Sequence, residues 1–514
     1  MTSAAATTIA PGEPSGFSRY FVRDFTASIV VFLVAMPLCM GIAIASGVPP
    51  EKGLVTGIIG GIVVGLLAGS PLQVSGPAAG LAVIVFEFVR DNGLSALGPV
   101  LVLAGALQVI AGIARMGGVF RAISPAVVHG MLAGIGALIV IGQFHILFDA
   151  KPLSSGIDNM AMMPTRLLSL TPFDIGTTEL ALMLGLLTIG TMIVWEKVKP
   201  ASLGLLPGAL LGVLAATGVA WAFGLNVARI AVPDSIAAAF ALPEAGIFST
   251  LTQGSMIVSA IAIAFIASAE TLLSAAAVDR MHDGVRTDYN KELRAQGVGN
   301  LLCGVFNALP MTGVIVRSSA NVQAGAMTRT SAVLHGAWIL GFVALLPFVL
   351  RQVPMAALGG VLVVTGWKLI SLKHVQHLYK VYGYMPALIW TATFVLVVTT
   401  DLLTGVLVGL ALSALELLPF ARNLKFRVGE SSVGDTVKLE LEGAATFIGL
   451  ARLTNALEQL PQGKAVHVDL ERVHAIDHTT SEMLTEWLSR RRMRGNAVKV
   501  TGPAAILKSL AHAA

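Results

Sequence analysis

Long apolar stretches recur through the first four-fifths of the chain, and they set the strongest limit on its fold. Hydrophobic residues make up 55% of the 514 residues and charged residues only 12%, whereas soluble domains usually carry about 25% charged residues. A segment in lipid must pair its own backbone polar groups, so apolar stretches of this length favour membrane-spanning helices. The sequence therefore predicts a polytopic α-helical membrane protein.

Apolar length and flanking charge predict about 14 membrane segments. The segments that begin at Ser75 and Thr312 are short and interrupted by glycine. The expected segments are 24–45, 53–69, 75–89, 96–114, 123–148, 177–195, 203–223, 254–279, 292–308, 313–325, 330–350, 355–371, 385–400 and 402–420.

Lysine and arginine are unevenly divided between the two sides that these segments define. An even number of crossings puts both termini on one side, and the loops there carry about twice as many basic residues. Cytoplasmic loops are enriched in Lys and Arg, so we expect a multi-pass protein of the cell (inner) membrane with both termini cytoplasmic. Residues 1–20 then form a flexible cytoplasmic N-terminus, and the long loops near 149–176 and 224–250 lie outside.

The pattern changes after the last apolar segment. Residues 436–441, 465–470 and 497–501 alternate or run apolar like strands, and 481–492 has the period of an amphipathic helix. Strands alternating with helices predict a small cytoplasmic α/β domain over 431–514.

Glu270 lies in the middle of an apolar run that begins near Ile257. A charge at that depth costs about 2.5–3.5 kcal/mol on insertion scales, so it must be neutralised, paired or facing a polar cavity. Ser274 follows four residues later, which places both side chains on one helix face. This pair predicts a transport site.

Residues 37–54 (PLCMGIAIASGVPPEKGL) resemble the first-helix signature of the SulP sulfate permease family, which includes the vertebrate anion exchangers and prestin. Leu38 and Ile42 replace two polar residues of that signature. Three further stretches resemble later segments of the same family, and the tail at 468–477 (VDLERVHAID) resembles a STAS domain. These are 75–80 (SGPAAG), Glu270 with 291–300 (KELRAQGVGN), and 312–325 (TGVIVRSSANVQAG).

The resemblance implies an anion transport domain over 21–421, built as a seven-plus-seven inverted repeat. Segments 1–4 and 8–11 would form a core domain, and segments 5–7 and 12–14 a gate domain. The third and tenth segments would be half-helices that meet near the bilayer midplane. Paired, interrupted spans in matching positions of two halves point independently to a transporter site. The resemblance also implies a homodimer.

An anion in the membrane can be held by helix N-termini, which offer unpaired backbone N–H groups and about half a positive charge each. Arg317 adds a full charge; it either raises anion affinity or forms a structural ion pair with Glu270. Gln73, Ser75 and Asn321 could ligate substrate or bond between helices. The expected substrate-binding residues are Ser75, Gly76, Ala78, Ala79 and Gly80 from one half-helix, and Val316, Arg317 and Ser318 from the other.

Glu270 is expected to couple transport to a cation, with Ser274 as the hydroxyl one turn later. Protonated, or with Na⁺ bound as its metal ligand, Glu270 would no longer repel the anion. The alternative is a glutamate bonded to backbone inside the helix bundle. His129 and His145 are expected to pack rather than carry protons.

The tail reads Asp477-His478-Thr479-Thr480 where related bacterial domains carry a phosphorylated serine after the aspartate. We therefore expect this domain to serve dimer contacts and stability. The chain has no GxxxxGK[ST] loop, which gives ATP-driven transport no support. No cofactor and no nucleic-acid partner are expected, because the net charge of +5 reflects loop residues.

Together these features predict a secondary active transporter, not an enzyme, for a small anion. Sulfate and bicarbonate are the expected substrates. Transport is expected to be coupled to H⁺ or Na⁺ and to proceed by an elevator-type motion of the core domain against the gate domain. The alternatives are a dicarboxylate transporter, an uncoupled anion channel-like module of the same fold, and a sensor or scaffold whose working part is the tail.

Overall fold

The computed structural model describes most of the chain. Residues 1–16 of the expected N-terminal segment and most of the expected loop at 224–250 lie outside the described residues. The described residues are 17–120, 124–153, 155–170, 176–200, 203–231, 253–279, 281–282, 284–416, 426–433, 436–461, 464–493, 496–504, 506–507 and 510.

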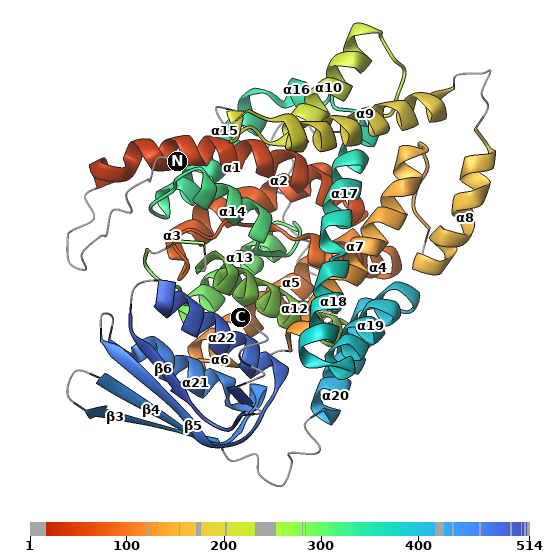
Figure 1. Ribbon diagram of the computed structural model, residues 1–514. Coiled ribbons are helices and arrows are strands. Elements are labelled where there is room, and N and C mark those ends of the chain that lie inside the picture. The colour runs from red at the N-terminus through yellow and green to blue at the C-terminus, as the bar shows by residue number, and fades with distance from the viewer. Residues whose placement is uncertain are drawn as a thin grey trace.

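The first half of the helical part runs from α1 to α10 (Figure 1). Its helices are α1 (Phe17–Ala45), α2 (Pro50–Ile59), α3 (Gly65–Leu67), α4 (Ala79–Asn92), α5 (Leu97–Ile113), α6 (Gly117–Phe120), α7 (Pro125–Leu147), α8 (Gly156–Leu168), α9 (Thr177–Val198) and α10 (Gly208–Ala222). A π-helical turn, η1 (Gly60–Val64), joins α2 to α3, and a 3₁₀ turn, η2 (Leu94–Ala96), precedes α5.

The second half runs from α12 to α20. Its helices are α12 (Gly254–Asp279), α13 (Tyr289–Val305), α14 (Ile315–Gln323), α15 (Thr330–Leu345), α16 (Pro347–Leu350), α17 (Met355–Leu369), α18 (Leu372–Tyr382), α19 (Tyr384–Thr399) and α20 (Leu402–Leu415).

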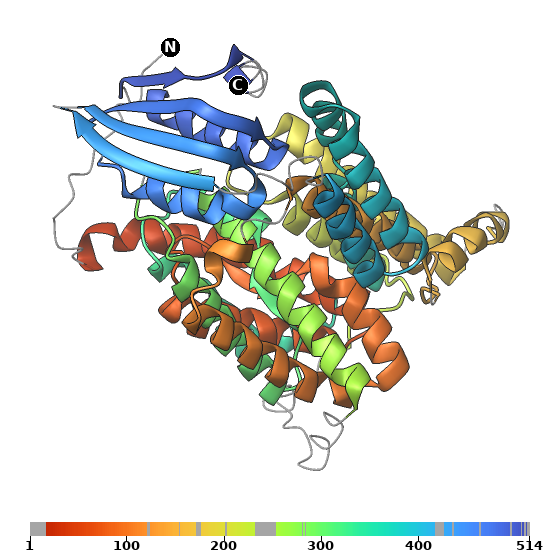
Figure 2. The same ribbon diagram turned by 90° about the horizontal axis from the view of Figure 1, so that it is seen from below.

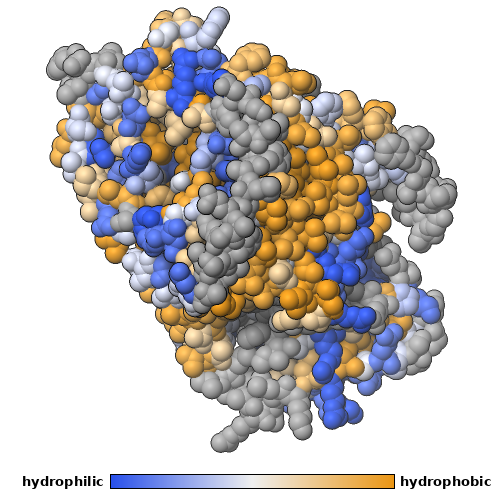
Figure 3. Space-filling model, turned by 180° about the vertical axis from the view of Figure 1, so that it is seen from behind, coloured by the Kyte–Doolittle hydropathy of each residue, from blue (hydrophilic) through white to orange (hydrophobic). Residues whose placement is uncertain are grey.

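Length and composition show that this is a membrane-spanning bundle. Seven helical stretches among the described residues are long and apolar enough to cross a bilayer, and four shorter helices are also apolar. Figure 3 shows a broad hydrophobic surface over one face of the molecule, bordered by hydrophilic areas. The predicted polytopic helical class is confirmed.

Two helices lie where the sequence suggested only connections. α8 falls inside the expected outer loop 149–176, and α18 follows the expected segment 355–371. Both are strongly amphipathic rather than apolar throughout. A search for long apolar runs passes over such helices because polar and charged residues interrupt their apolar face.

The two halves repeat one arrangement in opposite directions. In the first half α1 and α2 are followed by the short strand β1 (Ser75–Pro77) and then by α4; in the second, α12 and α13 are followed by β2 (Met311–Gly313) and then by α14. β1 and β2 pair antiparallel. The expected inverted repeat is therefore visible at the centre of the molecule.

Glycine permits very close helix packing in both halves. At the crossing of α5 and α13, a Cβ on Gly105 would lie 2.6 Å from the Gly297 carbonyl oxygen, and a Cβ on Gly297 would lie 2.7 Å from the Gly105 carbonyl oxygen. α7 and α17 meet in the same way at Gly136 and Gly366. Small residues replace hydrophobic collapse as the basis of helix association in lipid.

The helices pack in two sets. α5 packs on α12 and α13, and α1 packs on α2, α14 and α15; separately, α7 packs on α17, α19 and α20, and α9 packs on α10 and α17. Fewer contacts join the sets, chiefly α1 with α17 and α4 with α7.

A four-stranded sheet and two helices form the C-terminal domain (Figure 2). The strand order is β3-β4-β5-β6, with β3 antiparallel to β4 and the other pairs parallel. α21 contacts α6 of the helical part. The sequence missed β3 and α21, and the sheet begins ahead of the expected boundary at 431. The elements are β3 (Phe426–Val433), β4 (Thr436–Ala445), α21 (Phe447–Gln459), β5 (Ala465–Ile476), α22 (His478–Met493) and β6 (Val498–Thr501).

Candidate functional site

A two-stranded ladder joins the starts of two short helices. Ser75 pairs with Gly313, Gly76 with Thr312, and Pro77 with Met311. The Val314 N–H extends the ladder by donating to the Val74 carbonyl oxygen at 2.9 Å. α4 starts two residues after β1 and α14 starts two residues after β2, so the ladder holds the two helix N-termini together.

Neither of these helices has a side-chain cap. The N-cap residues are Ala78 and Val314, whose side chains accept no hydrogen bond. The first N–H groups of an α-helix have no partner within the helix. Both tips therefore offer backbone donors and the positive end of a helix dipole, as an anion site requires.

The tips differ in how open they are. On α14, Ile315 is 39% and Val316 45% exposed. On α4, Ala79 is half-buried, whereas Ala78 and Gly80 are buried. A small anion could thus reach the α14 amides from an open side and the α4 amides beside Ala79.

The serine hydroxyls of the expected site serve the scaffold. The Ser318 hydroxyl accepts from the Val74 N–H at 2.9 Å and donates to the Val314 carbonyl oxygen at 2.7 Å. The Ser75 hydroxyl accepts from Gln296 at 2.6 Å. These contacts engage both hydroxyls within the scaffold, and neither of them caps the first N–H groups of α4 or α14.

Glu270 on α12 lies against the start of α4. A Cβ on Gly80 would lie 2.5 Å from the Glu270 Oε2 atom, so only glycine leaves room for this carboxylate. Oε2 is buried and has no hydrogen-bond partner in the described structure. An ionised carboxylate without a partner is costly in such a place, which favours a bound proton or cation.

Ser274 lies one turn further along α12 and is buried. Within the described part of the chain, no group of three or more His, Cys, Asp or Glu side chains is placed to hold a metal ion. A cation at Glu270 would therefore meet one carboxylate with hydroxyl and backbone oxygens. Such a donor set suits a proton or Na⁺ better than a transition metal.

Arg317 does not point at Glu270. Its side chain is fully buried and packs on Gly76 of β1, where a Cβ would collide with Nη1. None of its three guanidinium nitrogens has a hydrogen-bond partner, and no ion pair joins it to Glu270 in the described structure. The alternative of a structural ion pair between them is thus wrong. Arg317 is a fixed positive charge behind the ladder.

Gln73, Ser75 and Asn321 each form a hydrogen bond within the scaffold, and the Gln73 Oε1 and Asn321 Oδ1 atoms have no hydrogen-bond partner in the described structure. Gln73 Nε2 donates to the Thr271 carbonyl oxygen at 2.9 Å, and Asn321 Nδ2 donates to the Leu72 carbonyl oxygen at 3.0 Å. Thr271, next to Glu270, also accepts from the Gly313 N–H through its hydroxyl at 3.1 Å. Thr271 of α12 is therefore tied to both strands at the Ser75–Gly313 end of the ladder.

Glu292 on α13 is a buried carboxylate that the sequence reading did not assign. Its Oε2 accepts from the N–H groups of Gly69 and Ser70 at 2.8 and 2.9 Å, and its Oε1 accepts from Gln296 at 3.0 Å. Gln296 in turn donates to Ser75. The signal was an acid and an amide four residues apart in a membrane segment, which places both on one helix face.

Each of the two histidines of α7 contacts a neighbouring helix. The His129 ring lies 3.8 Å from the His374 ring, centroid to centroid. A nitrogen of His145 lies 3.1 Å from the Asn159 carbonyl oxygen.

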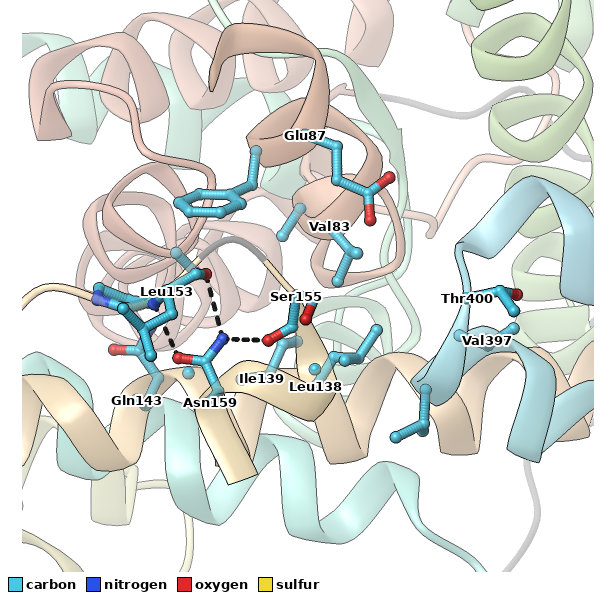
Figure 4. A pocket seen from close by; sticks show the side chains of 17 residues that line it. Val83, Glu87, Leu138, Ile139, Gln143, Leu153, Ser155, Asn159, Val397 and Thr400 are labelled. Carbon is cyan, nitrogen blue, oxygen red and sulfur yellow. Dashed lines mark hydrogen bonds between the residues drawn. The ribbon is translucent and has the colours of Figure 1, made fainter. Parts of the chain in front are cut away.

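A separate cavity of about 60 Å³ lies between α4, α7, α8 and the end of α19 (Figure 4). Glu87 reaches it from α4 and Thr400 from the end of α19. Asn159 fixes the loop at its edge, because its side chain donates to the carbonyl oxygens of Leu153 and Ser155. The cavity lies where α4 of one packed set meets α7 of the other, and its lining on α4 begins at Ala82, two residues after Gly80.

Comparison with known proteins gives one family for the helical part and one for the tail. Residues 21–393 match the sulfate permease family, and residues 428–514 match a STAS domain of the Mlab type.

Curated relatives match over most of their length. The chain is 30% identical to YvdB of Bacillus subtilis, whose name assigns it provisionally to sulfate transport, over 98% of this chain and 95% of that protein. It is 26% identical to the bicarbonate transporter BicA of Picosynechococcus sp., over 75% of this chain and 68% of that protein.

Solved structures share the fold. The transmembrane domain of a cyanobacterial bicarbonate transporter BicA superposes with a TM-score of 0.65 at 22% identity, covering 77% of this chain and 97% of that one. Murine Solute Carrier 26 family member A9, in the inward-facing state, gives 0.66 at 15% identity, covering 97% and 88%.

Proposed function

The chain belongs to the sulfate permease family and carries a C-terminal STAS domain, and on this basis we propose that it is a secondary active transporter of a small inorganic anion such as sulfate or bicarbonate. The observation that carries the proposal is the pair of uncapped helix N-termini held by the β1–β2 ladder. Two such tips supply about one positive charge, and only the Glu270 carboxylate described above lies against one of them.

Backbone ligation favours a small substrate. Leu38 and Ile42 of α1 are buried in the same apolar cluster as Ala78 at the start of α4. Ser75 and Ser318 are engaged within the scaffold. Few polar side chains remain that could bind the outer groups of a large or branched anion. Sulfate and bicarbonate therefore fit this site better than a dicarboxylate.

Glu270 is the proposed coupling group. When it is ionised, it places a negative charge beside the α4 tip and opposes anion binding there. When it carries a proton or Na⁺, that repulsion disappears. Anion and cation then favour each other's binding by the same factor, as linkage requires.

The proposed motion moves the ladder with its supporting helices against the other set. α1, α2, α4, α5 and α12 to α15 would form the moving core, and α7, α9, α10, α17, α19 and α20 the gate. The denser packing within each set than between them supports this division. Both termini would be cytoplasmic, as the distribution of basic residues favours, and the protein would work as a homodimer.

Uptake into proteoliposomes tests the proposal. The purified protein is given labelled sulfate or bicarbonate under separate H⁺ and Na⁺ gradients. Saturable uptake that follows one cation gradient is the expected result, and Glu270→Gln should abolish the response to that gradient. Glu196→Gln is a matched control, because Glu196 is exposed and pairs only with Lys199 at the surface.

Two results would contradict the proposed function. Anion current that neither saturates nor follows either gradient would mean a channel-like module. Absence of anion uptake in protein that is folded and correctly inserted would refute transport.

A further inference from the structure

The surface of α18 has three distinct faces. Leu378 is fully buried and Val375 half-buried where α18 packs on α7 and α19, and the His374 ring lies on His129 of α7. Leu372 and Tyr379, seven residues apart, form an exposed apolar edge with exposures of 58% and 63%. The remaining face is polar and includes two lysines.

Three lysines are exposed on or beside that polar face. Lys373 and Lys380 are exposed, and Lys368 is exposed on the last turn of α17. In the described structure none of these three lysines forms an ion pair. The sequence contains no Asp or Glu from residue 293 to residue 400, so nothing nearby in the chain neutralises them.

Two exposed aromatic side chains flank α18 in the sequence. Trp367, just before α18, is 66% exposed, and Tyr384, just after it, is 72% exposed. Trp and Tyr are enriched where a membrane meets water, and a helix with one apolar edge and a basic face lies well at that boundary.

The topology places α18 on the side of the C-terminal domain. α19 and α20 pack on each other as a hairpin, with Asp401 capping the turn between them. A hairpin brings the end of α20 back to the level of α18. Figure 1 shows α18 and α19 side by side on the flank of the helical part.

We infer that α18 is a binding surface for anionic phospholipid headgroups of the leaflet next to the STAS domain. The apolar edge of Trp367, Leu372 and Tyr379 enters the acyl boundary, and Lys368, Lys373 and Lys380 contact headgroup phosphates. Three unneutralised cations beside an exposed apolar edge match an anionic lipid surface in charge and in polarity.

Brominated lipids test this directly, because bromine quenches only tryptophan that it touches. The full-length protein is reconstituted with brominated phosphatidylglycerol or brominated phosphatidylcholine, and the Trp367 signal is taken as the difference from Trp367→Phe. We expect Trp367 to contact both lipids and to prefer phosphatidylglycerol. With Lys373→Gln and Lys380→Gln together, the preference should fall roughly 30-fold at low salt.

Two further variants keep the result unambiguous. Lys373→Arg with Lys380→Arg keeps both charges and should keep the preference, whereas Lys464→Gln with Lys499→Gln removes two charges from the STAS domain and should leave it unchanged. Two results would overturn the inference: no quenching of Trp367 by either lipid, or an equal preference in the glutamine variant and the unchanged protein.

Discussion

The Gly80 Cα faces the Glu270 carboxylate so closely that a side chain at position 80 would press on the charge-bearing oxygens. A Cβ there would lie 2.5 Å from Oε2 and 2.9 Å from Oε1. The first turn of one half-helix and the acidic group of another helix therefore share one small space.

Gly80→Ala should uncouple transport without unfolding the protein. The added methyl meets the flexible end of Glu270, so the carboxylate can move aside at a cost of about 1–3 kcal/mol. We expect the ratio of uptake with and without the driving cation gradient to fall close to one. Gly190→Ala on α9 is the control, because a Cβ there meets nothing within 4 Å. An unchanged ratio in Gly80→Ala would mean that Glu270 does not couple anion transport to the cation.

Arg317→Met should weaken anion binding while leaving the fold at least as stable. A unit charge several ångströms from the anion contributes on the order of 2 kcal/mol at an effective dielectric constant of about 20, so KM should rise roughly 30-fold. The guanidinium is buried without partners, and replacing such a charge by an apolar side chain is often stabilising. A lower melting temperature with an unchanged KM would show a purely structural role.

Ser318→Ala should loosen the ladder. It leaves the buried Val74 N–H without its acceptor, which costs about 1–3 kcal/mol. Thermal unfolding in detergent measures the loss. The neighbouring Ser319→Ala is the control: Ser319 donates only to the Val316 carbonyl oxygen in its own helix, so a change within about 0.5 kcal/mol is expected. Equal losses in both variants would contradict the assigned contact.

Glu292→Ala should destabilise the protein more than Ser318→Ala or Ser319→Ala does. It removes the acceptor of three buried donors, and hydrogen bonds to a charged group contribute about 1.5–3 kcal/mol each. We expect poor yield and a large fall in melting temperature, with Glu292→Gln intermediate. The exposed Glu196→Ala serves as control. A stable Glu292→Ala protein would mean that residues 69–70 are held by other contacts.

The STAS domain should lose a small stabilising contribution in acid. The backbone N–H of Glu471 and then the Lys438 ammonium, 2.9 Å away, hold the pKa of Asp469 below its usual range. A carboxyl with a lowered folded pKa stabilises above its unfolded pKa of about 3.9, and this contribution disappears as pH falls through the folded value.

Asp469→Asn tests that contribution. The variant should exchange amide hydrogens of β4 and β5 faster than the unchanged protein at pH 7, and the difference should shrink as the pH falls through the lowered folded pKa of Asp469. The effect should be small because partly exposed ion pairs contribute little. A difference that persists at the acid end would exclude ionisation of Asp469 as its cause.

The sequence identified the parts of the candidate site because each carries a signal in residue type and depth. A glutamate amid apolar residues and two glycine-interrupted segments are visible without coordinates, and they point to Glu270, α4 and α14. The strand pairing of β1 and β2 gave no such signal, because three-residue strands are too short for any period.

The direction in which the side chains of the candidate site point could not be predicted from the sequence. Arg317 and Glu270 have opposite charges in two expected membrane segments of the second half, which suggested a pair, yet Arg317 turns toward Gly76 because glycine leaves space there. Glu292 was missed for a related reason: its partners are backbone groups of residues 69–70, more than 200 positions away. Backbone partners have no residue type to recognise.

The antiparallel bonding of residues 75–77 to residues 311–313 has a mechanical consequence. The hydrogen bonds between the two strands fix the distance between the N-termini of α4 and α14 when the chain folds. Movement of the surrounding helices would leave that distance unchanged. Selectivity among anions would then depend on a binding site whose geometry is the same in the inward-facing and outward-facing states. The proposed motion would change only the side of the membrane from which that site is accessible.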